Sequence, residues 1–162
     1  MDLLLTPPAA AGPVRLGSTY EEVLVAVRPW GEPRVLGPTS RRARRLMCDA
    51  DGIGCTVLFD VSDRAAAVEL WWPGEGRRST TRVLLEGRDV FTSPAGDVLA
   101  GVRERGWTVD AADPEDVVVP GVSLGFTRRT SQEVPRDGEG LPVSFTSVLV
   151  AGPDHYDFRS TR

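Results

Sequence analysis

The clearest hydrophobic pattern in the chain is the alternation of apolar and polar positions over residues 44–60, RRLMCDADGIGCTVLFD. A two-residue turn at Asp51-Gly52 favours a tight hairpin and would place Cys48 opposite Cys55. In that register one face carries only apolar or thiol side chains: Leu46, Cys48, Ala50, Ile53, Cys55, Val57 and Phe59. The pattern therefore predicts a β-hairpin with one buried face.

Further strands are predicted after this hairpin. Residues 64–72 add an apolar set to the same face: Ala66, Val68, Leu70 and Trp72. Residues 81–91 are predicted as another strand, bent at Gly87. The segments 117–126 and 141–152 are expected to pair as strands joined by the polar loop 127–140.

A first short helix is predicted between a cap at Ser18 or Thr19 and a stop at Gly31. Glu21 or Glu22 lies three residues after either cap, which is the spacing of a capping box. Its apolar stripe consists of Val23, Leu24 and Val27. So short a helix is not stable alone and must pack on a sheet.

A second helix is predicted over residues 92–107, with Ser93 as its cap and Pro94 at the first helical position. Its apolar stripe repeats the spacing of the first helix: Val98, Leu99 and Val102. Gly106 is expected to end it, as Gly31 ends the first.

These elements predict an α+β fold in which short helices pack on an antiparallel sheet. We expect a flexible N-terminal arm over 1–13, a first helix-plus-strands repeat over 14–91 and a second over 92–162, together forming one compact unit. Chance similarity between two short capped helices is the alternative to a true repeat.

Composition narrows the class of protein. A chain of 162 residues with 41% hydrophobic and 26% charged positions is typical of one globular domain. All 19 basic residues are arginine, and neither lysine nor asparagine occurs, which points to a GC-rich bacterial genome. The net charge of −4 and the absence of interleaved aromatic residues in the run 41–45 argue against nucleic-acid binding.

The chain has no apolar stretch of the roughly 20 residues that a membrane span needs. The segment 1–13 lacks the basic region of a secretory signal, so we expect no membrane association and a cytoplasmic location. Two cysteines do not make a disulfide framework. Cys48 and Cys55 are expected to be buried, inert thiols, although a disulfide between them is conceivable from their pairing.

No catalytic or metal constellation is recognisable. His155 is the single histidine, and beside Asp154 and Asp157 near the chain end it lacks the firm positioning that a general base needs. Neither a G-x-S-x-G elbow nor a phosphate-binding glycine loop is present, and the two cysteines lack further ligands. We therefore predict no catalytic residues, no metal and no cofactor. The segment from Tyr156 to Phe158 is expected to pack back on the sheet.

The candidate protein-binding residues are Trp71, Trp72, Trp107 and Glu69. Adjacent strand positions point to opposite faces, so one of the two neighbouring tryptophans can be core while the other meets a second layer, a partner or solvent. The alternative is that Trp71 is covered by the N-terminal arm or by the loop 73–80. Tryptophan is enriched among the residues that dominate binding energy at protein interfaces.

The spacing Leu16-Gly17-x-Thr19-x-x-x-Val23, closed by Gly31-x-Pro33, resembles the start of two related groups of small α+β proteins. These are the β-lactamase inhibitory proteins, with two tandem units, and the small lipoproteins of outer-membrane protein assembly, with one. The chain also resembles uncharacterised actinobacterial proteins that look like immunity proteins for toxins. The second unit has Thr92-Ser93-Pro94 in place of the glycine and threonine, and the lipobox and inhibitor disulfide cysteines are missing, which speaks against extracellular inhibition.

The sequence thus predicts a non-catalytic protein-binding module, an immunity-like or inhibitor-like partner of a toxin or enzyme. The alternative is a small-molecule-binding or isomerase-like protein, in which an apolar pocket encloses a carboxylate such as Glu69 or Glu86. A pocket holding a carboxylate would favour the alternative, and an exposed sheet face would favour the binding module.

Overall fold

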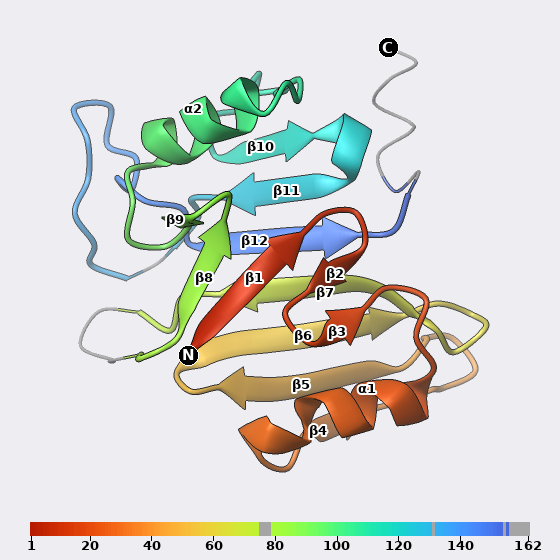
Figure 1. Cartoon of the computed structure of the whole chain (residues 1–162). Helices are drawn as coiled ribbons and strands as arrows, with labels where there is room; N and C mark the ends of the chain where they lie inside the picture. The colour runs from red at the N-terminus through yellow and green to blue at the C-terminus, as the bar shows by residue number, and fades with distance from the viewer. Residues whose placement is uncertain (75–78, 131, 154, 156–162) are drawn as a thin grey trace.

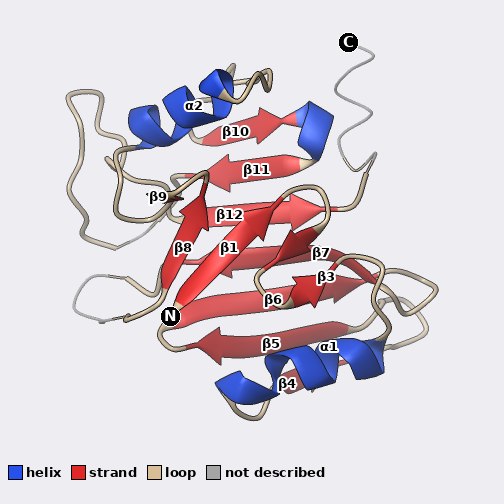
Figure 2. Cartoon of the chain, in the orientation of Figure 1, coloured by secondary structure: helices blue, strands red, loops and turns tan. Residues whose placement is uncertain are grey.

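A computed structural model of the chain describes residues 1–74, 79–130, 132–153 and 155. It is an α+β fold with two sheets and two short α-helices, as the sequence predicts (Figure 2). The seven-stranded sheet has the order β10 (Asp116–Val119), β11 (Leu124–Thr127), β12 (Ser147–Ala151), β7 (Ala65–Trp71), β6 (Ile53–Phe59), β5 (Arg45–Ala50), β4 (Arg34–Leu36). The five-stranded sheet has the order β3 (Val14–Arg15), β2 (Ala10–Ala11), β1 (Asp2–Thr6), β8 (Arg82–Leu85), β9 (Arg88–Asp89). The helices are α1 (Tyr20–Val27) and α2 (Ala95–Glu104), with 3₁₀ turns at Arg28–Trp30 and Pro120–Val122.

Both helices and the five-stranded sheet lie on the same side of the seven-stranded sheet. In Figure 1, β1 and β8 cross in front of the large sheet, with α1 near its β4–β5 edge and α2 near its β10 edge. A single core cluster joins Val23 of α1, Val98 of α2 and Leu3 of β1 to one face of the large sheet. That face contributes Leu46, Ala50, Ile53, Cys55, Val57, Phe59, Val68, Leu70, Val117, Val119, Leu124, Phe126, Val148 and Val150.

The β5–β6 hairpin has the predicted register. Ala50 pairs with Ile53, and Cys48 pairs with Cys55. Asp51 and Gly52 both adopt positive φ, at 52° and 96°, which is the conformation that an Asp-Gly turn provides. The turn chemistry and the alternation agree, so the apolar face of both strands is fixed toward the core.

The first helix begins where the sequence predicts. The Thr19 side chain accepts a hydrogen bond from the backbone N–H of Glu22 at 3.2 Å, which satisfies one of the free amides of the first turn. Gly31 closes the following 3₁₀ turn with a φ of 99°. Val23 and Val27 are fully buried, so the narrow stripe is the face that packs on the sheet.

The second helix begins one residue later than predicted. Pro94 occupies the N-cap position and no side chain caps the helix, so the assignment of Ser93 as the cap is wrong. Pro94 is extended, with φ and ψ of −55° and 140°. The first helical residue, Ala95, donates its backbone N–H to the Val143 carbonyl, so a loop contact takes the place of a side-chain cap. The predicted stripe of Val98, Leu99 and Val102 is buried.

The expectation of a loose N-terminal arm is wrong. Residues 2–6 form β1, which pairs in parallel with β8, and Asp2 makes a paired contact with the Arg82 guanidinium at 2.7 and 2.8 Å. Leu3 and Leu5 are 2% and 7% exposed, because alternate positions of β1 face the core. The strand could not be recognised from its local sequence, because its pairing partner β8 lies about eighty residues further along the chain.

Two strand boundaries and one register also differ from prediction. Residues 81–91 form a tight hairpin, β8–β9, turning at Glu86-Gly87, rather than one bent strand. Residues 117–126 form two antiparallel strands around Pro120–Val122, and only the second of them pairs with β12. A bulge in β7 places Ala65 rather than Ala66 opposite Phe59 in the core.

The strands that follow each helix run from an edge of the large sheet to its centre. After α1 the order is β4, β5, β6, β7, and after α2 it is β10, β11, β12. The two series meet where β7 pairs with β12 in antiparallel fashion. This arrangement is what two repeats would give, and the repeat itself remains a prediction.

The adjacent leucines of β1 provide a matched test of this packing. We expect Leu3→Ala to lower the free energy of unfolding by about 2–5 kcal/mol, because it removes a fully buried side chain. Leu4 is 57% exposed on the other face of the strand, so Leu4→Ala should change stability by less than about 0.5 kcal/mol. Denaturant unfolding measures both; equal losses, or none, would contradict the placement of β1.

Candidate functional site

The face of the seven-stranded sheet opposite the core is the candidate functional surface. One row of paired residues crosses all seven strands: Arg34, Met47, Thr56, Glu69, Leu149, Gly125 and Val118. The next row contains Asp49, Gly54, Trp71, Ser147, Thr127 and Asp116. None of these residues belongs to the core cluster, although Thr56 and Val118 are 7% and 1% exposed and Gly54 and Gly125 are also buried. We call the face they form the outer face.

Trp71 lies flat against the backbone at the centre of the outer face. A Cβ atom added to Gly54, its partner on β6, would approach the indole Cε2 to 1.9 Å. Only a residue without a side chain leaves room for the ring there. The close approach holds Trp71 down on β6 and leaves the indole partly exposed.

Glu69 lies two positions before Trp71 on the same strand, so both side chains point to the outer face. Its cross-strand neighbours are Thr56 and Leu149. Glu69 as a residue is partly buried, and the described residues give its side chain no hydrogen bond or ion pair, although its carboxylate oxygens are not among the fully buried atoms. Partial loss of water without a compensating partner is unfavourable for a charged group, so a cation from outside the chain would be stabilised here.

Arginines gather at one edge of the outer face. Arg34 of β4 and Arg45 of β5 are exposed, and Arg41 and Arg42 lie exposed in the loop that leads into β5. Arg44 points away instead, 3.7 Å above the Tyr20 ring and 3.1 Å from an Asp63 oxygen. The basic run therefore divides between an edge of the outer face and a contact with α1.

The structure separates the four predicted binding residues. Glu69 and Trp71 share the outer face. Trp72, the next residue along, packs partly against the core. Trp107 follows α2 and also packs on the core, with the Arg105 guanidinium 5.7 Å from its ring centroid. The tryptophans thus do not make one patch.

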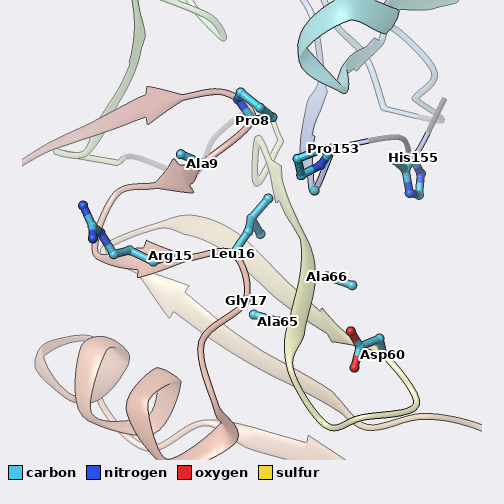
Figure 3. A pocket seen from close by; sticks show the side chains of 11 residues that line it. Pro8, Ala9, Arg15, Leu16, Gly17, Asp60, Ala65, Ala66, Pro153 and His155 are labelled. Atoms are coloured by element: carbon cyan, nitrogen blue, oxygen red, sulfur yellow. The ribbon is translucent and has the colours of Figure 1, made fainter. Parts of the chain in front are cut away.

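A cavity of about 730 Å³ lies where β7 begins and β12 ends. Figure 3 shows its three ionisable side chains, Arg15, Asp60 and His155, on separate sides of the cavity. Asp60 accepts hydrogen bonds from the backbone N–H groups of Ser62 and Arg64, at 2.8 and 3.1 Å, so it stabilises a turn. Among the labelled side chains, Asp60 and His155 come from separate elements, and Asp60 serves its own turn. Asp154 and Asp157, the expected neighbours of His155, lie outside the described residues, as do Tyr156 and Phe158.

A second, mainly apolar cavity of about 270 Å³ is lined partly by the segment that connects β11 and β12. Trp72, Phe91 and Phe145 supply its aromatic walls, and no carboxylate lines it. Glu86 lies elsewhere, exposed in the β8–β9 turn with an oxygen 3.6 Å from Arg105. Neither carboxylate that the small-molecule hypothesis requires is therefore enclosed by this pocket.

Both cysteines are free thiols. Cys55 is buried as expected, whereas Cys48 is only partly buried, which corrects the expectation of two fully buried thiols. A hydrogen bond between the thiols, more than desolvation, sets their titration: it lowers the pKa of Cys48 and raises that of Cys55 well above the usual value. Within the described residues, no group of three or more histidine, cysteine or acidic side chains could hold a metal ion.

Met47, Leu58 and Leu149 belong to the outer face but escaped the sequence analysis. Leu58 pairs with Arg45 and Ala67 in a third row of the same face. The signal was available, because these residues alternate with the predicted core positions. It was overlooked because several apolar residues in succession give the pattern of a strand that is buried on both faces.

Comparison of the chain with protein-family models, curated proteins and solved structures finds no match. No helix in the described part of the chain is both long and apolar enough to cross a bilayer. The resemblance based on the Leu16–Pro33 spacing accordingly remains a prediction, and function is inferred from the residues themselves.

The contact between Gly54 and Trp71 predicts the effect of one methyl group. Gly54→Ala should force the indole off β6, shifting the Trp71 ring N–H signal in a ¹H–¹⁵N spectrum and lowering the unfolding free energy by about 1 kcal/mol. A Trp71→Phe variant assigns the signal. Gly96→Ala is the control, because its added Cβ meets nothing within 4 Å. An unmoved Trp71 signal in Gly54→Ala would contradict the packing.

Proposed function

We propose that this chain is a non-catalytic binding protein whose outer face docks against another protein. The observation that carries the proposal is Glu69, a partly buried residue whose side chain has no partner among the described residues, set beside Trp71 in the middle of a sheet face outside the core. A basic side chain of the partner, held in an apolar surround, would pair with Glu69. Trp71 would supply the aromatic contact area that dominates many interfaces.

The area of the outer face indicates that a macromolecular partner would also contact the arginines at its edge. Strands spaced about 4.8 Å apart make seven strands about 29 Å wide, and five-residue strands are about 17 Å long. The resulting plane, on the order of 500 Å², is smaller than the roughly 800 Å² that each partner of a standard interface buries. Contacts to the arginine edge at Arg34, Arg41, Arg42 and Arg45 would complete the interface.

The charge pattern favours a protein over a nucleic acid. A nucleic acid is anionic throughout, so it would meet the arginine edge favourably and Glu69 unfavourably. Arg34 and Glu69 are three strands apart, about 14 Å, in one row of the sheet. A protein can present an acidic group over the first and a basic group over the second.

Catalysis gains no support from the candidate residues. Glu69 lies on an open sheet face, Glu86 is ion-paired at a turn, and Asp60 is bonded to its own turn. An inhibitor-like or immunity-like role, with a toxin or enzyme as the partner and the cytoplasm as the compartment, is the form of binding that the Leu16–Pro33 resemblance implies. No cofactor is part of this proposal.

The test is a binding assay with face-specific variants. The purified chain is used to capture its partner from the cells that express it, and the purified pair is then titrated. Glu69→Arg and Trp71→Ala should each weaken the Kd by about tenfold or more, because each removes a central contact. Glu69→Gln should have a smaller effect, since it keeps the shape and removes the charge.

Val25→Ala is the matched control, because Val25 is 61% exposed on α1, on the other side of the large sheet. It should leave the Kd unchanged. All variants are first compared by denaturant unfolding. If folded Glu69→Arg and Trp71→Ala bind as tightly as the natural chain, the outer face is not the docking surface and the proposal is wrong.

A further inference from the structure

Cys48 and Cys55 face each other across the β5–β6 hairpin, and they are the only cysteines of the chain. Directly opposite residues of antiparallel strands have Cα atoms about 4.5–5.5 Å apart in either type of pair. A disulfide requires a Cα separation of about 4.4–6.8 Å. The hairpin therefore already holds the two backbone positions at the spacing that a bridge needs.

The two thiols differ in access and in acidity. Cys48 is partly exposed, whereas Cys55 is 0% exposed. The hydrogen bond between them lowers the pKa of the Cys48 thiol and, together with burial, raises that of Cys55. A disulfide reagent from solvent would therefore meet Cys48 first, and the lower pKa of Cys48 gives it a larger thiolate fraction than Cys55.

We propose that Cys48 and Cys55 form a reversible oxidation site, at which a low-molecular-mass disulfide converts the facing thiols into a cross-strand disulfide. The Cys48 thiolate attacks one sulfur of the oxidant, the oxidant's S–S bond breaks, and one thiolate leaves and takes up the Cys48 proton. Cys55 then loses its proton and attacks the Cys48 sulfur, releasing the second thiol of the oxidant. The protein loses two hydrogen atoms and two electrons, and the oxidant becomes two thiols.

Oxidation would change the outer face as well as the core face. Met47 and Asp49 flank Cys48, and Gly54 and Thr56 flank Cys55, with all four positions on the outer face. A disulfide draws the two Cβ atoms to about 3.8 Å, closer than the roughly 4.5–5.5 Å of an ordinary cross-strand pair. The strands therefore tighten where Trp71 rests on Gly54. The chemical step is independent of docking, and only this consequence rests on the proposed function.

The experiment uses the full chain and glutathione disulfide as the oxidant. After incubation of the native protein, free thiols are alkylated in denaturant and the mass is measured. We expect a loss of about 2 Da and no alkylation, reversed by dithiothreitol. Cleavage before aspartate, at Asp49 and Asp51, should leave the two cysteine peptides joined until reduction.

The single variants separate the two steps. Cys55→Ser should stop at one glutathione adduct on Cys48, and Cys48→Ser should remain unmodified because its remaining thiol is buried. The mass measurement on the natural chain tests disulfide formation even if a variant does not fold. A persistent glutathione adduct, an intermolecular disulfide, or two thiols that remain alkylatable in the natural chain would each overturn the proposal. None of these outcomes depends on a partner, so failure here is distinct from failure of the docking proposal.

Discussion

Burial of one face of the seven-stranded sheet under α1, α2 and the five-stranded sheet is the constraint on which the rest of the structure depends. Side chains alternate along a strand, so covering one face with α1, α2 and the five-stranded sheet commits every second residue to the core. The remaining residues are left to the outer face. At the sheet centre this rule sends Val68 and Leu70 inward and Glu69 and Trp71 outward. The same alternation thus creates both the stable core and the surface available to a partner.

An uncovered sheet face must attract its partner without attracting other sheets. Apolar side chains such as Met47 and Leu149 favour contact, and an extended apolar face would invite nonspecific association. The Glu69 carboxylate among them makes association with a purely apolar surface costly, because the charge would be buried unpaired. A partner with a cation at the right place avoids that cost. Under the docking proposal, Glu69 would therefore provide selectivity as well as attraction.

Local chemistry predicted local structure well. The Asp51-Gly52 turn and the Thr19 cap are each determined within a few residues, and both were predicted from the sequence. Pairing between distant segments was not predictable in the same way. The pairing of β1 with β8 joins residues about eighty positions apart, and no sequence pattern marks it. The bulge at Ala66 and the entry into α2 at Pro94 likewise depend on tertiary contacts.

The candidate site was predictable in part for the same reason. Alternation places Trp71 and Trp72 on opposite faces, but which face is covered follows from the helices and the second sheet. Glu69 and Trp71 could be selected from composition and position. Their relation to Gly54 needed the register between β6 and β7, which gives the glycine its purpose.

Accessibility of the sheet's two faces is the most direct measure of the central claim. A soluble paramagnetic probe added to methyl-labelled protein should strongly relax the methyl groups of Leu58 and Leu149, which lie on the outer face. It should leave those of Val57 and Val150, both 0% exposed on the core face, almost unaffected. Equal protection of all four residues would mean that the outer face is covered within the chain itself, and would contradict the account.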